Sequence, residues 1–121
     1  MSQIFVVFAG LFGAIGVAFA AIAAHGGATA TLGSASQMLL FHAPVLLGVG
    51  LLGHTGNGAA GWVLPTGAGL ILLGCALFAG DLTTRQYRGH ALFPMAAPSG
   101  GTIMILGWVV IAVAGLLLLR R

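Results

Sequence analysis

The stretch MILGWVVIAVAGLLLLRR, residues 104–121, decides the fold class of this chain. Residues 104–119 contain no charged side chain, and two arginines follow at once. A run of about 20 apolar residues is long enough to cross the hydrocarbon core of a bilayer as a helix. We therefore expect a transmembrane helix over about 100–119, which Ser99 caps after Pro98.

Three further apolar runs precede this one, over about 3–24, 35–53 and 62–80. The whole chain of 121 residues is 60% hydrophobic and only 4% charged, whereas a soluble domain carries about a quarter charged residues. The runs show no alternation of polar residues, which excludes a membrane barrel and leaves helices. The predicted fold is all-α: one domain, residues 1–121, forming an antiparallel bundle of four transmembrane helices.

Polar and small residues mark the expected helix ends. Ser34 and Gln37 fit the S-x-x-Q capping box at the start of the second helix. Asn57-Gly58 predicts a turn before the third helix, and 81–98 is the longest and most polar predicted loop. The first run contains Ala21-Ile22-Ala23, which resembles a signal-peptidase site, but no Lys or Arg precedes it, so we expect a retained span.

The charged residues exclude a nucleic-acid partner and point to the bilayer. The formal net charge of +3 comes from four arginines and one acid. Nucleic-acid binders need clustered basic residues, whereas here Arg85 and Arg88 share one predicted loop and Arg120 and Arg121 close the chain. The two pairs balance under the positive-inside rule. We expect a multi-pass inner-membrane protein with both termini on one side, the cytoplasmic side.

Small residues predict how the helices pack. The stripes Gly10-Ala14-Ala18 and Gly16-Ala20-Ala24 place a small residue at every fourth position of the first helix. Such stripes let backbones approach closely, so we expect a tight bundle with no wide central pore. Trp108 lies within the fourth run, and we expect its indole N–H to find a partner inside the bundle.

Five short motifs resemble one family of small membrane proteins. In order along the chain they are AAHGG (23–27), QMLLFHA (37–43), LFAGDL (77–82), PMAAPSGG (94–101) and LGW (106–108). Together they resemble the small inner-membrane family catalogued as domain of unknown function 423. The family pattern favours the residues found here at His25, Gly26, Gln37, His42, Ala43, Gly80, Pro98, Gly100, Gly101, Gly107 and Trp108.

The resemblance implies a four-helix integral membrane protein and no established biochemical activity. This chain departs from the family pattern after Phe78. Ala79 and Asp81 stand where the family usually has small hydroxyl residues, and Thr83 stands where it commonly has an aromatic residue. Asp81 is therefore interpreted as a feature of this chain.

His42 is the first candidate for a functional residue. It lies about 12 Å along the second helix from Ser34, at 1.5 Å per residue. Ionisable groups at such depth are costly and often functional. Pro44 frees the carbonyl of Leu40, which offers a local acceptor. The alternative is a buried neutral histidine that is bonded across helices and stabilises the bundle.

The remaining histidines give weaker hypotheses. His25 followed by two glycines is typical of a helix end, since glycine adopts the left-handed conformation and a terminal histidine suits the helix dipole. A metal site formed by His25, His42 and His90 with Asp81 would draw its ligands from different segments. We therefore predict no metal site and no cofactor.

A possible anion or ligand site lies at the start of the fourth helix. Asp81 and Arg85 have the order and spacing of a helical ion pair. The N-termini of the second and fourth helices attract anions at the same side of the membrane. The ligand-binding candidates are therefore His25, Gln37, His42, Asp81, Arg85, Ser99, Gly100, Gly101 and Trp108, and simple helix capping is the alternative.

The sequence carries no recognisable enzyme motif. It has no G-x-S-x-G, no P-loop and no H-E-x-x-H, and its one acid excludes paired-carboxylate catalysis. The first hypothesis is a structural or accessory membrane protein that packs as a homo-oligomer or in a larger membrane complex. The second is a protein that binds or moves a lipid, anion, metal ion or proton at the polar residues around His25 and His42.

Overall fold

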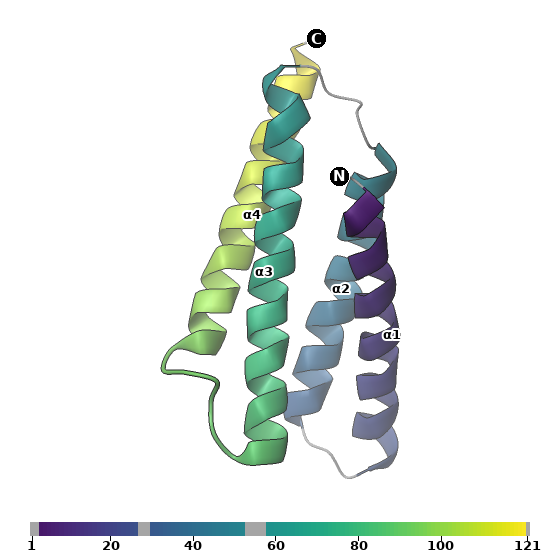
Figure 1. The fold of residues 1–121 in the computed structure, drawn as a ribbon, viewed down its shortest axis with the longest axis vertical. Helices are drawn as coiled ribbons and strands as arrows, with labels where there is room; N and C mark the ends of the chain where they lie inside the picture. Colours follow the sequence, from purple (N-terminus) through teal and green to yellow (C-terminus); the bar gives the residue numbers. More distant parts are fainter. Residues whose placement is uncertain (1–2, 27–29, 53–57, 121) are drawn as a thin grey trace.

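The protein is an all-α antiparallel array of four helices (Figure 1). The computed structural model describes residues 3–26, 30–52 and 58–120, and it shows no strand in those ranges. The helices are α1 (Gln3–His25), α2 (Ala30–Leu52), α3 (Ala59–Arg88) and α4 (Ala96–Leu119). All four are long and apolar enough to cross a membrane, which confirms the predicted fold class and a multi-pass membrane protein.

The four helices form two hairpins. α1 packs along α2 and α3 packs along α4, whereas α2 and α3 share a smaller contact that joins the hairpins. In Figure 1, α4 and α1 lie on opposite flanks, and the two ends of the chain lie toward the same end of the array. One apolar core runs through the array and includes Phe12, Leu46 and Ile71.

The backbones of α3 and α4 touch at two pairs of glycines. A Cβ atom on Gly74 would lie 2.6 Å from the carbonyl oxygen of Gly100, and one on Gly67 would lie 3.0 Å from that of Gly107. On each helix the two glycines are seven residues apart (67 to 74 and 100 to 107), so both fall on one stripe. Missing side chains therefore let the helices approach to backbone contact.

Side chains separate α1 from α2 at Gly16, the one buried glycine of α1. α1 buries Phe5, Ala9, Phe12 and Gly16. At Gly16 the nearest atoms of α2 belong to the Leu40 side chain, and the Ser36 hydroxyl donates to the Gly16 carbonyl at 2.7 Å. The prediction that Gly10-Ala14-Ala18 packs against a neighbour is wrong, because these three residues are exposed. Only Gly16 of the second predicted stripe is buried.

The second helix begins earlier than predicted. α2 starts at Ala30, so Ser34 lies inside the helix and the predicted capping box is wrong. Leu32, in the added first turn, is fully buried. Burial of this apolar side chain favours a helical turn at a place where the neighbouring Thr31, Gly33 and Ser34 suggested a loop. Pro44 lies inside α2 as expected.

The predicted loop 81–98 is much shorter than expected. α3 continues to Arg88, and Gly89 ends it in the left-handed conformation, with φ 76° and its N–H bonded to the Arg85 carbonyl. α4 begins at Ala96, so the prediction that Ser99 caps this helix is wrong. Pro98 is tolerated there because the first turn of a helix needs no N–H donor.

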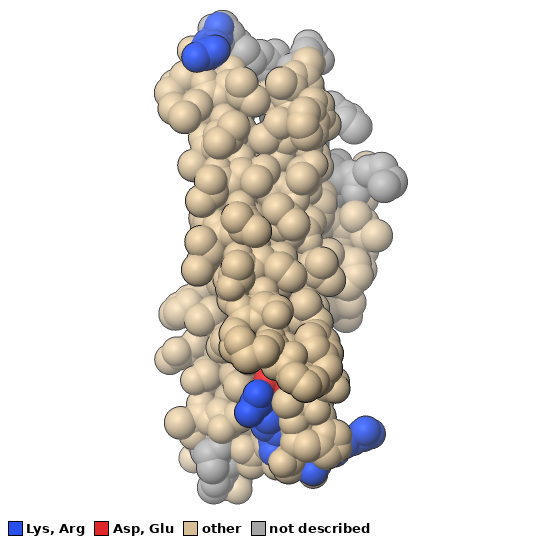
Figure 2. All heavy atoms as spheres, turned by 90° about the vertical axis from the view of Figure 1, so that its left-hand side faces the viewer, with Lys and Arg blue, Asp and Glu red and all other residues tan. Residues whose placement is uncertain are grey.

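Charged side chains gather at the two ends of the molecule. Figure 2, viewed from the α4 side, shows an uncharged surface between an arginine at one end and arginines with Asp81 at the other. The described arginines are Arg120 at the first end and Arg85 and Arg88 at the second. The predicted turn at Asn57 and the terminal Arg121 lie outside the described residues.

Candidate functional site

His42 is buried where α2 meets α4. Its Nδ1–H donates to the Met38 carbonyl at 2.7 Å, and its Nε2 accepts the indole N–H of Trp108 at 3.3 Å. A ring that accepts at Nε2 and donates at Nδ1 is the neutral Nδ1–H tautomer. Trp108 was expected to have a partner in the bundle, and the structure identifies it as His42. Both histidine nitrogens are used inside the protein. The acceptor is the carbonyl of Met38, whereas the sequence had pointed to that of Leu40.

The Met38 carbonyl also links α2 to α3. The thiol of Cys75, fully buried in α3, lies 3.4 Å from the Met38 oxygen. Together with the bond between His42 and Trp108, this contact ties α3 and α4 to one turn of α2. Sequence reasoning missed this role of Cys75, since the residues are 37 positions apart along the chain.

A hollow of about 290 Å³ lies beside the His42 ring. Its walls are apolar apart from the His42 and Trp108 rings, whose centroids are 6.0 Å apart. His42 and Gly101 line it together, which brings the second helix and the start of α4 to one place as predicted. His25 is not among the lining residues, which are Met38, His42, Phe78, Gly101, Met104, Ile105 and Trp108.

Asp81 forms a second polar centre, between α3 and α4. The side chain is fully buried. One carboxylate oxygen accepts from Arg85 Nε at 2.8 Å, which confirms the predicted ion pair, and the other accepts from the Leu92 amide at 2.9 Å. Asp81 thus ties the α3–α4 turn to α3.

The other predicted site residues lie apart from these two centres. His25 is exposed at the end of α1, and its Nδ1 donates to the carbonyl of Ala21 in the same helix. Gln37 and His90 are also exposed. Gly100 is buried against Gly74, whereas Ser99 lines a shallow surface hollow with Met95 and Pro98. The described residues contain no group of three His, Cys, Asp or Glu side chains that could hold a metal ion.

A match to one protein family classifies the chain. Residues 9–101 match the family described as a protein of unknown function (DUF423). The chain belongs to this family. No curated protein and no solved structure matches it.

The family match covers most of the candidate residues. It includes His42, Asp81 and Gly100, but it ends before Trp108. The LGW motif at 106–108, which the sequence analysis counted in the resemblance, therefore lies beyond the matched segment. The family description assigns no activity to this DUF423 protein.

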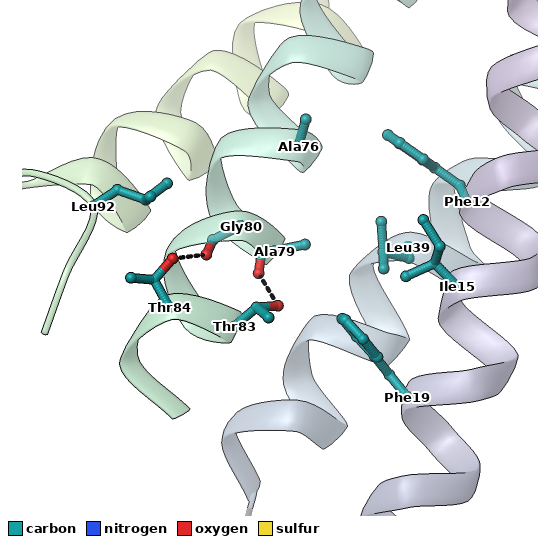
Figure 3. A pocket seen from close by; sticks show the side chains of 10 residues that line it. All are labelled: Phe12, Ile15, Phe19, Leu39, Ala76, Ala79, Gly80, Thr83, Thr84 and Leu92. Carbon is teal, nitrogen blue, oxygen red and sulfur yellow. Dashed lines mark hydrogen bonds between the residues drawn. The ribbon is translucent and has the colours of Figure 1, made fainter. Parts of the chain in front are cut away.

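A groove lies between the two hairpins of the protein (Figure 3). It has a volume of about 360 Å³ and is open on one side. Phe12, Ile15 and Phe19 of α1 face small residues of α3 across it, with Leu39 of α2 between them. Its α3 wall and one end are formed by Ala76, Ala79, Gly80, Thr83, Thr84 and Leu92.

The groove is apolar although two threonines line it. Thr83 donates its hydroxyl to the Ala79 carbonyl at 2.7 Å, and Thr84 donates to the Gly80 carbonyl at 2.8 Å. Both hydroxyls are thus satisfied by their own helix. The groove therefore offers a contact surface for an apolar molecule. The sequence pattern did not predict this groove, because α1 and α3 are not neighbours along the chain.

Proposed function

We propose that this protein is a structural or accessory component of the membrane and not an enzyme. One observation carries the proposal: among the described residues, every buried side-chain nitrogen or oxygen has a hydrogen-bond partner within the chain. The His42 ring joins α2 to α4, Asp81 fixes the α3–α4 turn, and Ser36 joins α2 to α1. An active site would keep such groups directed at a substrate.

Partners are proposed from the outer surfaces. α1 and α4 lie on the flanks and expose large apolar side chains, among them Leu11, Val17, Ile105 and Leu116. Such surfaces are stable against lipid tails or against another membrane helix. We propose that the protein packs as a homo-oligomer or within a larger membrane complex, and that it has no nucleic-acid partner.

The location is proposed to be the bacterial inner membrane, with both termini in the cytoplasm. The antiparallel array supports termini on one side, and the resemblance of the motifs supports the inner membrane. Each end carries two arginines, so the positive-inside rule does not choose between the orientations. Labelling of a cysteine placed at residue 2 in a Cys75→Ala background, with a membrane-impermeant maleimide, tests the orientation. Labelling in intact cells would contradict it.

Native mass spectrometry of the protein from gentle detergent extracts tests the structural role. We expect a defined oligomer or a stoichiometric protein partner. A monodisperse monomer without a partner would contradict the proposal. A strain that lacks the gene gives a second readout, since a structural role predicts complementation by His42→Asn, whose amide retains a hydrogen-bonding group.

A second candidate function is the binding of a small ligand beside His42. The hollow of about 290 Å³ favours it, because this space joins two polar rings to the start of α4. The same mass spectra, with metal analysis, distinguish the candidates. A retained small molecule or ion that disappears in Trp108→Phe would support ligand binding. Spectra without such a species, together with full complementation by His42→Asn, would exclude it.

A further inference from the structure

Gln37 is a polar side chain on the outer side of α2. It is exposed, whereas Leu46 is fully buried in the core. The two residues are nine positions apart (37 to 46), which is about two and a half helical turns, so they lie on opposite sides of the helix. Gln37 therefore lies on the side of α2 that faces away from the other helices. Within the ranges that the structure describes, its amide forms no hydrogen bond.

The depth of Gln37 in the membrane makes a free amide unfavourable. α2 has 23 residues and is apolar enough to span a bilayer. Its length of about 34 Å is close to the hydrocarbon thickness of about 30 Å, and Gln37 lies about 10 Å along the helix from Ala30. Hydrocarbon offers an amide no hydrogen bond. A neighbouring helix that supplies one is therefore favoured over contact with lipid tails.

The exposed residues of α2 form one continuous face around Gln37. They recur at alternating steps of three and four residues, which is the spacing of the seam between two packed helices. Phe41 and Leu51 on this face are 63% and 73% exposed. Gly48 has nothing within 4 Å of a Cβ atom, so a second helix could approach closely there. The members of this surface, called the Gln37 face, are Ser34, Gln37, Phe41, Pro44, Gly48 and Leu51.

A second copy of the chain complements the Gln37 face. Copies inserted in the same direction are related by a two-fold axis along the membrane normal, so each residue near the axis meets its own equivalent at the same depth. A glutamine amide is both a donor and an acceptor, and two such amides can therefore form reciprocal hydrogen bonds. The exposed Thr66 of α3 and Thr102 of α4 need no such partner, because each donates to a carbonyl of its own helix.

We infer that the Gln37 face of α2 is the interface of a parallel homodimer. Gln37 of one copy bonds to Gln37 of the partner subunit, and Gly48 lets the two α2 backbones approach. This inference rests on the proposed homo-oligomer and names the surface that forms it.

Dimerisation of the full chain in phosphatidylcholine vesicles tests the inference. Energy transfer between donor-labelled and acceptor-labelled copies, measured over a range of protein-to-lipid ratios, gives the dissociation constant of the dimer. We expect Gln37→Leu, which removes the amide and keeps a side chain of similar size, to raise this constant about eightfold, the effect of two average interhelical hydrogen bonds in membranes. Thr102→Val, which removes a polar group from the exposed surface of α4, leaves the constant unchanged.

A larger side chain at Gly48 tests the close approach of the two helices. Gly48→Leu raises the dissociation constant about tenfold, because the added atoms must fit between the packed helices. The fold of the single chain is retained, since a Cβ there lies in open space. Gly115→Leu is the matched control on α4, where the surroundings are equally open, and it leaves the constant unchanged. Helical circular dichroism and the melting temperature show that each variant is folded.

Cysteine cross-linking locates the interface directly. In a Cys75→Ala background, Phe41→Cys places one thiol on the Gln37 face of each copy, and these thiols face each other across the two-fold axis. A disulfide needs Cα atoms within about 7 Å, so oxidation in the membrane should give a cross-linked dimer only if the two faces meet. Leu106→Cys, on the exposed surface of α4, should give none.

The outcomes separate this inference from the proposed function. A wild-type dimer that neither Gln37→Leu nor Gly48→Leu weakens, and that Phe41→Cys does not cross-link, overturns the interface and leaves the structural role intact. A monomeric chain that binds a different protein stoichiometrically also overturns the interface and leaves that role intact. A monomer without any partner contradicts both proposals.

Discussion

The two hairpins, α1/α2 and α3/α4, differ in the atoms that meet between their helices. In α3/α4 the backbones touch, because Gly67 and Gly74 face Gly107 and Gly100. In α1/α2 the side chains of Leu39 and Leu40 stand between the helices, and Gly16 is the only buried glycine of α1. Backbone atoms of a facing helix cannot move away unless the whole helix shifts, whereas a leucine side chain can change its rotamer. Substitutions of similar size should therefore lower the free energy of unfolding more in α3/α4, the second hairpin, than in α1/α2, the first.

The largest effect is expected from Gly74→Ala. Its new Cβ would lie 2.6 Å from the Gly100 oxygen and 2.7 Å from the Met104 nitrogen, both backbone atoms, so the helices must separate. We expect a loss of about 3 kcal/mol in the free energy of unfolding, the upper range for overpacking. Steric trapping in bicelles measures it. Gly69→Ala is the control on the same helix, because nothing lies within 4 Å of a Cβ there. Equal stabilities of the two variants would refute the backbone contact.

Asp81→Ala is expected to have the next largest effect. It removes the acceptor for the Leu92 amide, and it leaves Arg85 without its acid. Loss of a buried hydrogen-bond partner that leaves a donor unpaired costs about 2 kcal/mol in the free energy of unfolding. Hydrogen exchange of the Leu92 amide should accelerate. The exposed Arg88→Gln serves as control, and an unchanged exchange rate in Asp81→Ala would contradict the assigned bond.

Gly16→Ala tests the first hairpin against the second. Its Cβ would lie 2.8 Å from Cγ and 2.9 Å from Cδ2 of Leu40, and a change of the Leu40 χ1 rotamer moves both atoms away. The Cβ of Leu39, at 3.3 Å, needs to shift by only a few tenths of an ångström. We expect a loss of about 1 kcal/mol in the free energy of unfolding, clearly less than for Gly74→Ala. Gly13→Ala, with open space around its Cβ, is the control. A cost equal to that of Gly74→Ala would remove the distinction between the hairpins.

Trp108→Phe is expected to have the smallest effect. It removes the hydrogen bond to His42 and retains an aromatic ring. Interhelical hydrogen bonds in membranes are worth about 0.6 kcal/mol on average, and we expect a loss of this size in the free energy of unfolding. The ¹⁵N spectrum of His42 should show an Nε2 shift, while Nδ1 stays protonated. Trp62→Phe should leave that spectrum unchanged, and a histidine spectrum that is insensitive to Trp108→Phe would contradict the contact.

The sequence predicted what depends on local pattern. Four apolar runs gave the four helices, because charged residues cannot lie in lipid, and the spacing of Asp81 and Arg85 gave their ion pair. The helix ends were less predictable. Polar residues of α3 such as Thr83 and Thr84 continue the helix by bonding carbonyls one turn back, although their polarity suggested a loop.

Contacts between distant segments escaped prediction for a physical reason. Small residues recur on α1, α3 and α4, and periodicity does not show which stripe meets a partner and which meets lipid. Gly10 and Gly74 therefore look alike in the sequence, yet the first has open space and the second touches backbone. Likewise, Trp108 was expected to have a partner, but its position 66 residues from His42 left that partner undetermined.

The most direct test of the glycine contact compares two adjacent glycines of α4. A Cβ on Gly100 would lie 2.6 Å from the Gly74 oxygen and 2.8 Å from the Phe78 nitrogen, whereas nothing lies within 4 Å of one on Gly101. Measured by steric trapping in the same bicelles, the free energy of unfolding should fall by about 3 kcal/mol in Gly100→Ala. In Gly101→Ala it should change by less than about 0.5 kcal/mol. Equal free energies for these two variants would contradict backbone contact between α3 and α4.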